Sequence, residues 1–125
     1  RPTLLRSEVD EEGRRIVSKR TATEVAEMLE GVLAAGGTAE EASVPGYVVA
    51  GKTGTAEKVD PETGTYSETK FVASFAGFAP AKDPRLLVSV MVDEPQGMYY
   101  GGEVAAPAFE QIMAFALPYL RIPPD

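Results

Sequence analysis

The chain has 125 residues, enough for one domain, and its 19 acidic against 12 basic side chains give a formal net charge of -7. It contains neither cysteine nor histidine, which excludes disulfides, thiolate or imidazole metal sites, cysteine nucleophiles and a Ser-His-Asp triad. Because an acidic chain repels phosphate backbones, nucleic acid is a poor candidate partner. The hydrophobic share of 44% is typical of a globular domain, and the apolar runs are too short to span a membrane.

Residues 1–20 predict a β-hairpin. The apolar pairs Leu4-Leu5 and Ile16-Val17 flank the acidic segment Asp10-Glu11-Glu12-Gly13, in which Asp and Gly favour a tight connection between two extended segments. We expect the acidic segment to be a solvated tip.

Residues 21–37 predict a helix over 22–35 that a Gly-Gly pair ends. Thr21 and Glu24 have the spacing of a capping box, in which each side chain binds a backbone N–H at the helix start. Apolar residues then recur with helical period, and Met28, which lies within this stripe, is expected to pack in the core.

Three antiparallel strands are predicted within residues 46–93. Runs rich in β-branched and aromatic residues occupy 46–53, 70–79 and 86–93. The turns between them contain Pro and Gly and are too short for a crossover helix, which favours antiparallel pairing.

A Gly-rich loop at 95–103 and a helix within 104–118 complete the predicted elements. Pro107 suits the first turn of this helix and Pro118 ends or kinks it, whereas the Pro123-Pro124 tail is expected to fray. The predicted fold class is therefore α+β, an antiparallel sheet with helices packed on it.

The segment Gly46-Tyr47-Val48-Val49-Ala50-Gly51-Lys52-Thr53 matches the phosphate-binding pattern G-x-x-x-x-G-K-[ST]. Such a loop curls its backbone N–H groups around phosphate and opens a helix, whereas Tyr-Val-Val-Ala favours a strand and no helical pattern follows. We therefore expect 46–51 to be extended and no helix to start at Lys52 or Thr53. A nucleotide-binding protein is the distant alternative.

Lys52-Thr53-Gly54 is also one of three signatures of penicillin-binding proteins and class A β-lactamases, the others being S-x-x-K and S-D-N. The chemistry explains these residue types. An edge strand can pair with an extended peptide, Lys52 supplies a positive charge, and Thr53 and Thr55 supply hydroxyls for a carboxylate. Gly54 has no side chain to block a substrate that lies across the strand.

The context of this motif is more specific than its three letters. The chain resembles the C-terminal part of the transpeptidase domain of class B penicillin-binding proteins, most closely the division-type enzymes, over nearly its whole length. The segments that carry the resemblance are Gly46 to Ala56, Phe75 to Pro80, Asp83 to Leu86, Asp93 to Pro95, Tyr99 to Gly102, and Ala106-Pro107.

The resemblance implies the penicillin-binding transpeptidase and serine β-lactamase-like fold. It also implies a serine D,D-transpeptidase that cross-links peptidoglycan stem peptides and that β-lactams acylate. The catalytic motif would be Lys52, Thr53, Gly54 and Thr55. Thr53 and Thr55 would bind the carboxylate of a stem peptide or β-lactam, and the Thr55 N–H would be an oxyanion-hole donor.

The resemblance further implies that Tyr99 and Tyr100 form an aromatic wall beside the cleft and that Gly101 and Gly102 let this substrate-binding loop turn. Packing of the two tyrosines on the sheet is an even alternative. No metal or cofactor is implied. The parent protein would work with cell-division proteins on the extracytoplasmic face of the bacterial membrane, anchored by an N-terminal transmembrane helix.

Two of the three family signatures are missing. The S-x-N motif is absent because the chain has no asparagine, and the only S-x-x-K, Ser67 to Lys70, lies downstream of Lys52 in a polar segment that predicts a turn. We therefore expect Ser67 to be a decoy. The whole chain, 1–125, would be the C-terminal portion of a transpeptidase domain, inactive without the upstream half. The alternative is a non-catalytic binding module built on the same sheet.

Overall fold

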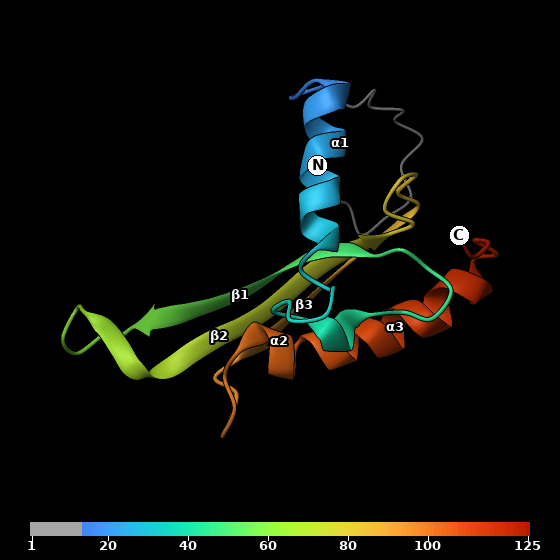
Figure 1. Cartoon of the computed structure of the whole chain (residues 1–125). Coiled ribbons are helices and arrows are strands. Elements are labelled where there is room, and N and C mark those ends of the chain that lie inside the picture. The colour runs from blue at the N-terminus through green and yellow to red at the C-terminus, as the bar shows by residue number, and fades with distance from the viewer. Residues whose placement is uncertain (1–13) are drawn as a thin grey trace, which may run out of the picture.

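The computed structural model describes residues 14–125 and confirms the α+β fold class (Figure 1). In chain order the elements are α1 (Lys19–Glu30), the one-turn 3-10 helix η1 (Glu40–Ala42), β1 (Ala50–Val59), β2 (Tyr66–Ala79), β3 (Leu86–Asp93), α2 (Gly101–Val104) and α3 (Ala106–Tyr119). Among the described residues, none of the helices is both long and apolar enough to cross a membrane.

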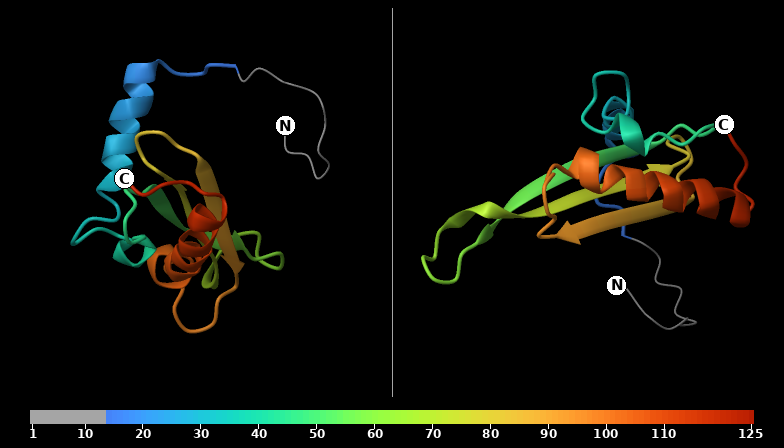
Figure 2. Two further views of the ribbon diagram at one scale, coloured as in Figure 1. Left: turned by 90° about the vertical axis from the view of Figure 1, so that its right-hand side faces the viewer. Right: turned by 90° about the horizontal axis from the view of Figure 1, so that it is seen from below.

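The three strands form one antiparallel sheet in the order β1-β2-β3, as predicted. The register places Thr53 opposite Phe75 and Phe75 opposite Val90, so these side chains share one face. Helix α3 lies along that face (Figure 2). Phe75 meets Phe109 of α3 edge to face, with ring centroids 4.7 Å apart, and both are fully buried. This contact centres the hydrophobic core.

Strand β1 begins at Ala50 and not at Gly46, so the predicted range 46–53 is wrong at both ends. Gly46 has a φ of 84°, which favours glycine and breaks an extended run. The residues before the strand bind the C-terminus instead. The N–H of Val48 donates to the Asp125 carboxylate at 2.6 Å, and the N–H of Asp125 donates to Gly46 at 3.0 Å. The tail is therefore tied down, contrary to the predicted fraying.

Lys52 and Thr53 lie inside β1 and no helix starts at either of them, which removes the structural basis for a phosphate-binding loop. The strand continues to Val59, and β2 begins at Tyr66, four residues before its predicted start. Most of these added residues are polar or small and exposed, so their sequence carries no strand pattern. Cross-strand pairing extends the hairpin beyond the helices, as Figure 1 shows.

Helix α1 is shorter and more exposed than the sequence predicts. Its cap is Ser18, whose Oγ accepts from the N–H of Thr21 at 3.0 Å, and it ends at Glu30. Val32 and Leu33 leave the helix because they pack against the core. Met28, predicted to be buried, is 74% exposed, because no described segment covers that side of α1.

The remaining predictions concern the two ends of the chain. Residues 1–13, most of the predicted hairpin, lie outside the described residues. Within 14–18 there is no strand, and Lys19 and Arg20 already belong to α1. The C-terminal helix α3 spans Ala106–Tyr119, one residue beyond the predicted 104–118 at its end, with Pro118 in its last turn. The predicted loop at 95–103 contains the start of the short helix α2.

Candidate functional site

The Lys-Thr-Gly motif lies on β1, an edge strand of the described sheet. Side chains alternate along a strand, so Thr53 and Thr55 point to the face that α3 covers, whereas Lys52 and Gly54 belong to the other face. Thr53 is half-buried, and Lys52 and Thr55 are exposed. The motif thus presents two hydroxyls at the rim of the core and one ammonium beside them.

The two threonines open into a cavity of about 330 Å³ between β1 and α2. The cavity brings together five residues that the sequence analysis assigned to the site and two that it did not, Thr38 and Glu103. Its lining residues are Thr38, Thr53, Thr55, Tyr100, Gly101, Gly102 and Glu103. Thr38 lies 15 residues before Thr53, in a segment with no pattern of its own. Nothing in the spacing of the sequence could have placed it here.

Close packing requires the two glycines of α2. A Cβ on Gly101 would overlap the backbone oxygens of Ser74 and Gly54, and one on Gly102 would overlap the backbone oxygen of Thr38. Neither glycine has a positive φ, and both are helical, so the expected role in turning the loop does not describe them. Their lack of a side chain lets α2 approach β1 closely enough to wall the cavity.

The hydroxyl oxygens of Thr53 and Thr55 both accept hydrogen bonds from neighbouring nitrogen groups. The N–H of Gly101 donates to Thr55 Oγ1 at 3.1 Å, and Lys52 Nζ donates to Thr53 Oγ1 at 3.2 Å. Both partners can only donate, so each threonine oxygen accepts. The Thr55 proton is then available to a ligand, whereas the Thr53 proton can go either to a ligand or to Thr38 Oγ1. Thr38 Oγ1 lies 3.3 Å from Thr53 Oγ1 and completes a short network of hydroxyls. Two O–H donors next to an ammonium form a set that suits a carboxylate.

The two tyrosines of the loop differ in their surroundings. Tyr99 stacks on Phe71 of β2 with ring centroids 4.3 Å apart, and its hydroxyl donates to Tyr100 at 3.2 Å. This hydrogen bond, followed by the charges of Tyr100 and Glu103 and by burial, raises the pKa of Tyr99. Tyr100 is more exposed than Tyr99 and lines the cavity between β1 and α2, called the carboxylate cavity below because of the ligand that its donors suit. Tyr99 therefore packs on the sheet and supports Tyr100, whereas a role of the two rings in substrate binding stays a prediction.

An ion-pair cluster holds the segment that leads to the tyrosines. Lys58 Nζ lies 2.8 Å from Asp93 and 2.7 Å from Glu94, joining the far part of β1 to the turn after β3. The hydrogen bonds that Lys58 Nζ donates to Asp93 and then to Glu94 raise the pKa of Lys58. The N–H of Glu94 also donates to Phe71 at 2.9 Å. These acids therefore have a structural role, which argues against acid–base catalysis.

Ser67 is not placed as a nucleophile. It lies within β2, where the sequence predicted a turn, and its Oγ accepts from the N–H groups of Thr69 at 3.3 Å and Lys70 at 3.1 Å. A Ser-x-x-Lys pair that acts in catalysis needs both side chains on one face, as at a helix start. Ser67 does not line the cavity between β1 and α2 that contains Thr53 and Thr55. It also does not line a second cavity formed by Thr55, Tyr99 and Tyr100.

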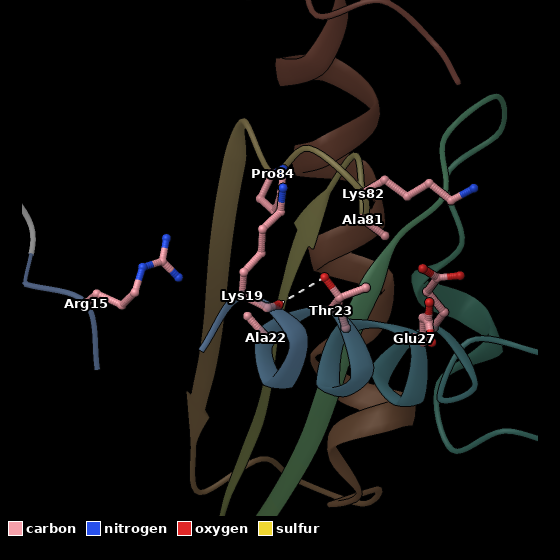
Figure 3. A pocket seen from close by; sticks show the side chains of 10 residues that line it. Arg15, Lys19, Ala22, Thr23, Glu27, Ala81, Lys82 and Pro84 are labelled. Carbon is pink, nitrogen blue, oxygen red and sulfur yellow. Dashed lines mark hydrogen bonds between the residues drawn. The ribbon is translucent and has the colours of Figure 1, made fainter. Parts of the chain in front are cut away.

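Another cavity, of about 600 Å³, lies between α1 and the turn after β2 (Figure 3). Lys19 extends from α1 toward Pro84 across it, and the Thr23 hydroxyl donates back to the Lys19 carbonyl at 3.1 Å. None of the predicted site residues line this cavity. Within residues 14–125, no group of three potential metal ligands comes together.

Residues 1–114 match the family described as the penicillin-binding protein transpeptidase domain. The chain belongs to this family. The predicted resemblance to penicillin-binding transpeptidases is thereby confirmed.

Curated relatives carry the same assignment in their names. The chain is 46% identical over 114 residues to the probable peptidoglycan D,D-transpeptidase PenA of Neisseria gonorrhoeae, covering 90% of this chain and 19% of that protein. It is 43% identical over 114 residues to the peptidoglycan D,D-transpeptidase FtsI of Escherichia coli, again 90% of this chain and 19% of the relative. The chain thus spans about a fifth of the length of these relatives.

Solved structures agree on the fold. The transpeptidase domain of penicillin-binding protein 3 from Burkholderia pseudomallei aligns with a TM-score of 0.79 at 46% identity, covering 90% of this chain and 34% of the other. Penicillin-binding protein 3 from Mycobacterium tuberculosis, complexed with ampicillin, aligns with a TM-score of 0.80 at 37% identity, covering 89% and 26%. The predicted penicillin-binding and β-lactamase-like fold is therefore confirmed.

Proposed function

We propose that this chain is the C-terminal portion of a serine D,D-transpeptidase domain that cross-links peptidoglycan stem peptides and is acylated by β-lactams. The observation that carries the proposal is the placement of the Thr53 and Thr55 hydroxyls at one cavity, beside the Lys52 ammonium. Stem peptides and penicillins share a terminal carboxylate next to the amide bond that reacts. The names of the relatives support the same reaction.

The residues of this chain hold the substrate while a serine attacks. Thr53 and Thr55 bind the carboxylate and Lys52 supplies the compensating charge. In the acylation step the serine oxygen bonds to the carbonyl carbon, the amide C–N bond breaks, and the leaving nitrogen takes the proton. The N–H of Thr55 is proposed to donate to the oxyanion that forms during this step. One such donor contributes about 3–4 kcal/mol of transition-state stabilisation.

We propose that the nucleophile and its base lie outside the chain, in the upstream half of the domain. The sheet face opposite α3 supports a missing partner. Leu87 and Met91 of β3 are 67% and 72% exposed on it, and Met28 of α1 is exposed as well. Large exposed apolar side chains that share one face of a sheet, as Leu87 and Met91 do, are typical of a surface that another part of a protein covers.

Further parts of the proposal come from the family resemblance alone. They are a role in division, with cell-division proteins as partners, and a place on the extracytoplasmic face of the bacterial membrane, where an N-terminal transmembrane helix anchors the parent. The competing function is a non-catalytic binding module on the same sheet.

Covalent labelling with a fluorescent penicillin tests the proposal. We expect no label on this chain alone and a label on the full-length protein that contains it. Lys52→Ala should reduce that label sharply, because the carboxylate loses its counter-charge. The matched control is Lys82→Ala, which should label normally, because Lys82 is an exposed lysine that lines the cavity beside α1 and not the cavity at Thr53. An unlabelled full-length protein would support the binding module, and an adduct on Ser67 would overturn the inactive-fragment proposal.

A further inference from the structure

A second cavity adjoins the carboxylate site along β1. Its volume is about 560 Å³, and it shares Thr55 and Tyr100 with the carboxylate cavity. Its lining residues are Thr55, Ala56, Glu57, Tyr66, Phe71, Tyr99 and Tyr100. A ligand whose carboxylate lies at Thr53 and Thr55 can therefore extend into it without leaving the surface.

The lining of this cavity places one carboxylate, that of Glu57, among aromatic rings. Glu57 stands directly opposite Phe71 in the β1–β2 register, so the two share a face with Thr55. Phe71, Tyr99 and Tyr100 form a continuous stack, with centroid separations of 4.3 Å and 4.5 Å. Tyrosine phenols are uncharged near pH 7, and the raised pKa of Tyr99 takes this phenol further from ionisation. Glu57 is therefore the only charged side chain in the lining.

Nearby cations do not neutralise Glu57. Lys58, its neighbour in sequence, is held by Asp93 and Glu94 and is not part of the lining. Among the described residues, the salt bridges of the chain do not include Glu57. An anionic group beside the electron-rich faces of several rings is a setting that attracts ammonium groups.

We propose that this cavity is a subsite for an ammonium-bearing group of the substrate or inhibitor, bound by Glu57 and the aromatic stack. The inference rests on the proposed function, and it adds a charge preference that the carboxylate site does not contain. Thr55 and Glu57 are two residues apart on one strand, which separates their Cα atoms by about 7 Å. The preferred ligand is thus a zwitterion whose ammonium and carboxylate can span that distance.

Ampicillin and benzylpenicillin provide the test, because ampicillin differs from benzylpenicillin by one ammonium group on its side chain. The second-order acylation rate constants of both are measured on the full-length protein by competition with a fluorescent penicillin. We expect Glu57→Gln to lower the rate for ampicillin about two- to fivefold, the size expected of an exposed ion pair. The rate for benzylpenicillin should change little, which also shows that the variant is folded.

Glu62→Gln is the matched control, because Glu62 is an exposed acid in the turn between β1 and β2 and lines neither cavity. It should leave the ratio of the two rates unchanged. The subsite is overturned if Glu57→Gln is labelled but leaves the ratio of the ampicillin and benzylpenicillin rates unchanged. An equal fall in both rates gives that same unchanged ratio. A full-length protein that neither penicillin acylates overturns the proposed function, and the subsite with it.

Discussion

The two faces of the sheet differ in how far other elements cover them. On one face α3 seals the core, and α2 packs against β1 so closely that only glycine fits at Gly101 and Gly102. On the other face Leu87 and Met91 remain exposed, with the Lys52 side chain beside them at the edge strand. The covered face holds Thr53 and Thr55, the two threonines that we propose bind the carboxylate of the substrate. The open face is where we propose that the upstream half of the domain supplies the nucleophile.

The largest expected effect is a difference in stability between substitutions on the two faces of the sheet. Phe109→Ala should lower the free energy of unfolding of this chain by about 3–5 kcal/mol, because it removes a fully buried ring that packs on Phe75. Met91→Ala on the open face should change it by less than about 0.5 kcal/mol. Urea denaturation of the two variants measures the contrast. Equal losses would mean that the open face is already covered in the isolated chain.

A second prediction concerns the contact between α2 and β1. Gly102→Ala forces a Cβ against the Thr38 backbone, and the displacement of α2 should cost about 1–3 kcal/mol of stability and reduce penicillin labelling of the full-length protein. The control is Gly31→Ala, where φ is -61° and the added Cβ lies 3.3 Å from the nearest backbone oxygen. Unimpaired labelling in Gly102→Ala would show that the close approach of α2 is not needed for the site.

The third prediction isolates the hydroxyl of Thr55. Thr55→Val keeps the shape of the side chain but removes the proton offered to the carboxylate. The second-order rate of acylation of the full-length protein should fall about tenfold, since a hydrogen bond to a charged group contributes about 1.5 kcal/mol. Thr55→Ser, which restores the hydroxyl, should recover most of the rate. Failure of serine to recover it would assign the loss to packing.

The sequence predicted the covered face better than the details of the site. Alternating and continuous apolar runs predicted the antiparallel sheet, because burial imposes a pattern on residues such as Phe75. The polar ends of β1 and β2 were missed, since pairing across the hairpin and not side-chain burial keeps them extended. Met28 was misplaced because periodicity shows which residues share a face and not whether that face is covered.

Within the site, the motif and the resemblance predicted which residues of β1 and of the Tyr-Tyr-Gly-Gly loop belong together. They did not predict Thr38 or Glu103. These two residues line the cavity because the fold brings their segments next to β1. The role of the two glycines was also misjudged. A glycine that permits a turn and one that permits close packing look alike in sequence, and only the neighbouring backbone of Ser74 and Thr38 distinguishes them.

The smallest expected effect concerns Glu103, the one acid in the lining of the carboxylate cavity. Its charge opposes a bound carboxylate across solvent, so Glu103→Gln should raise the acylation rate of the full-length protein about twofold, within the range of an exposed charge interaction. Benzylpenicillin is the appropriate probe, because it lacks the ammonium that the neighbouring cavity is proposed to bind. The gain should shrink toward about 1 M salt, where the Debye length is about 3 Å. Glu62→Gln, with the same change far from the lining, should show no gain. A lower rate in Glu103→Gln would instead mean that this carboxylate has a structural role in the cavity that outweighs its repulsion of the bound carboxylate.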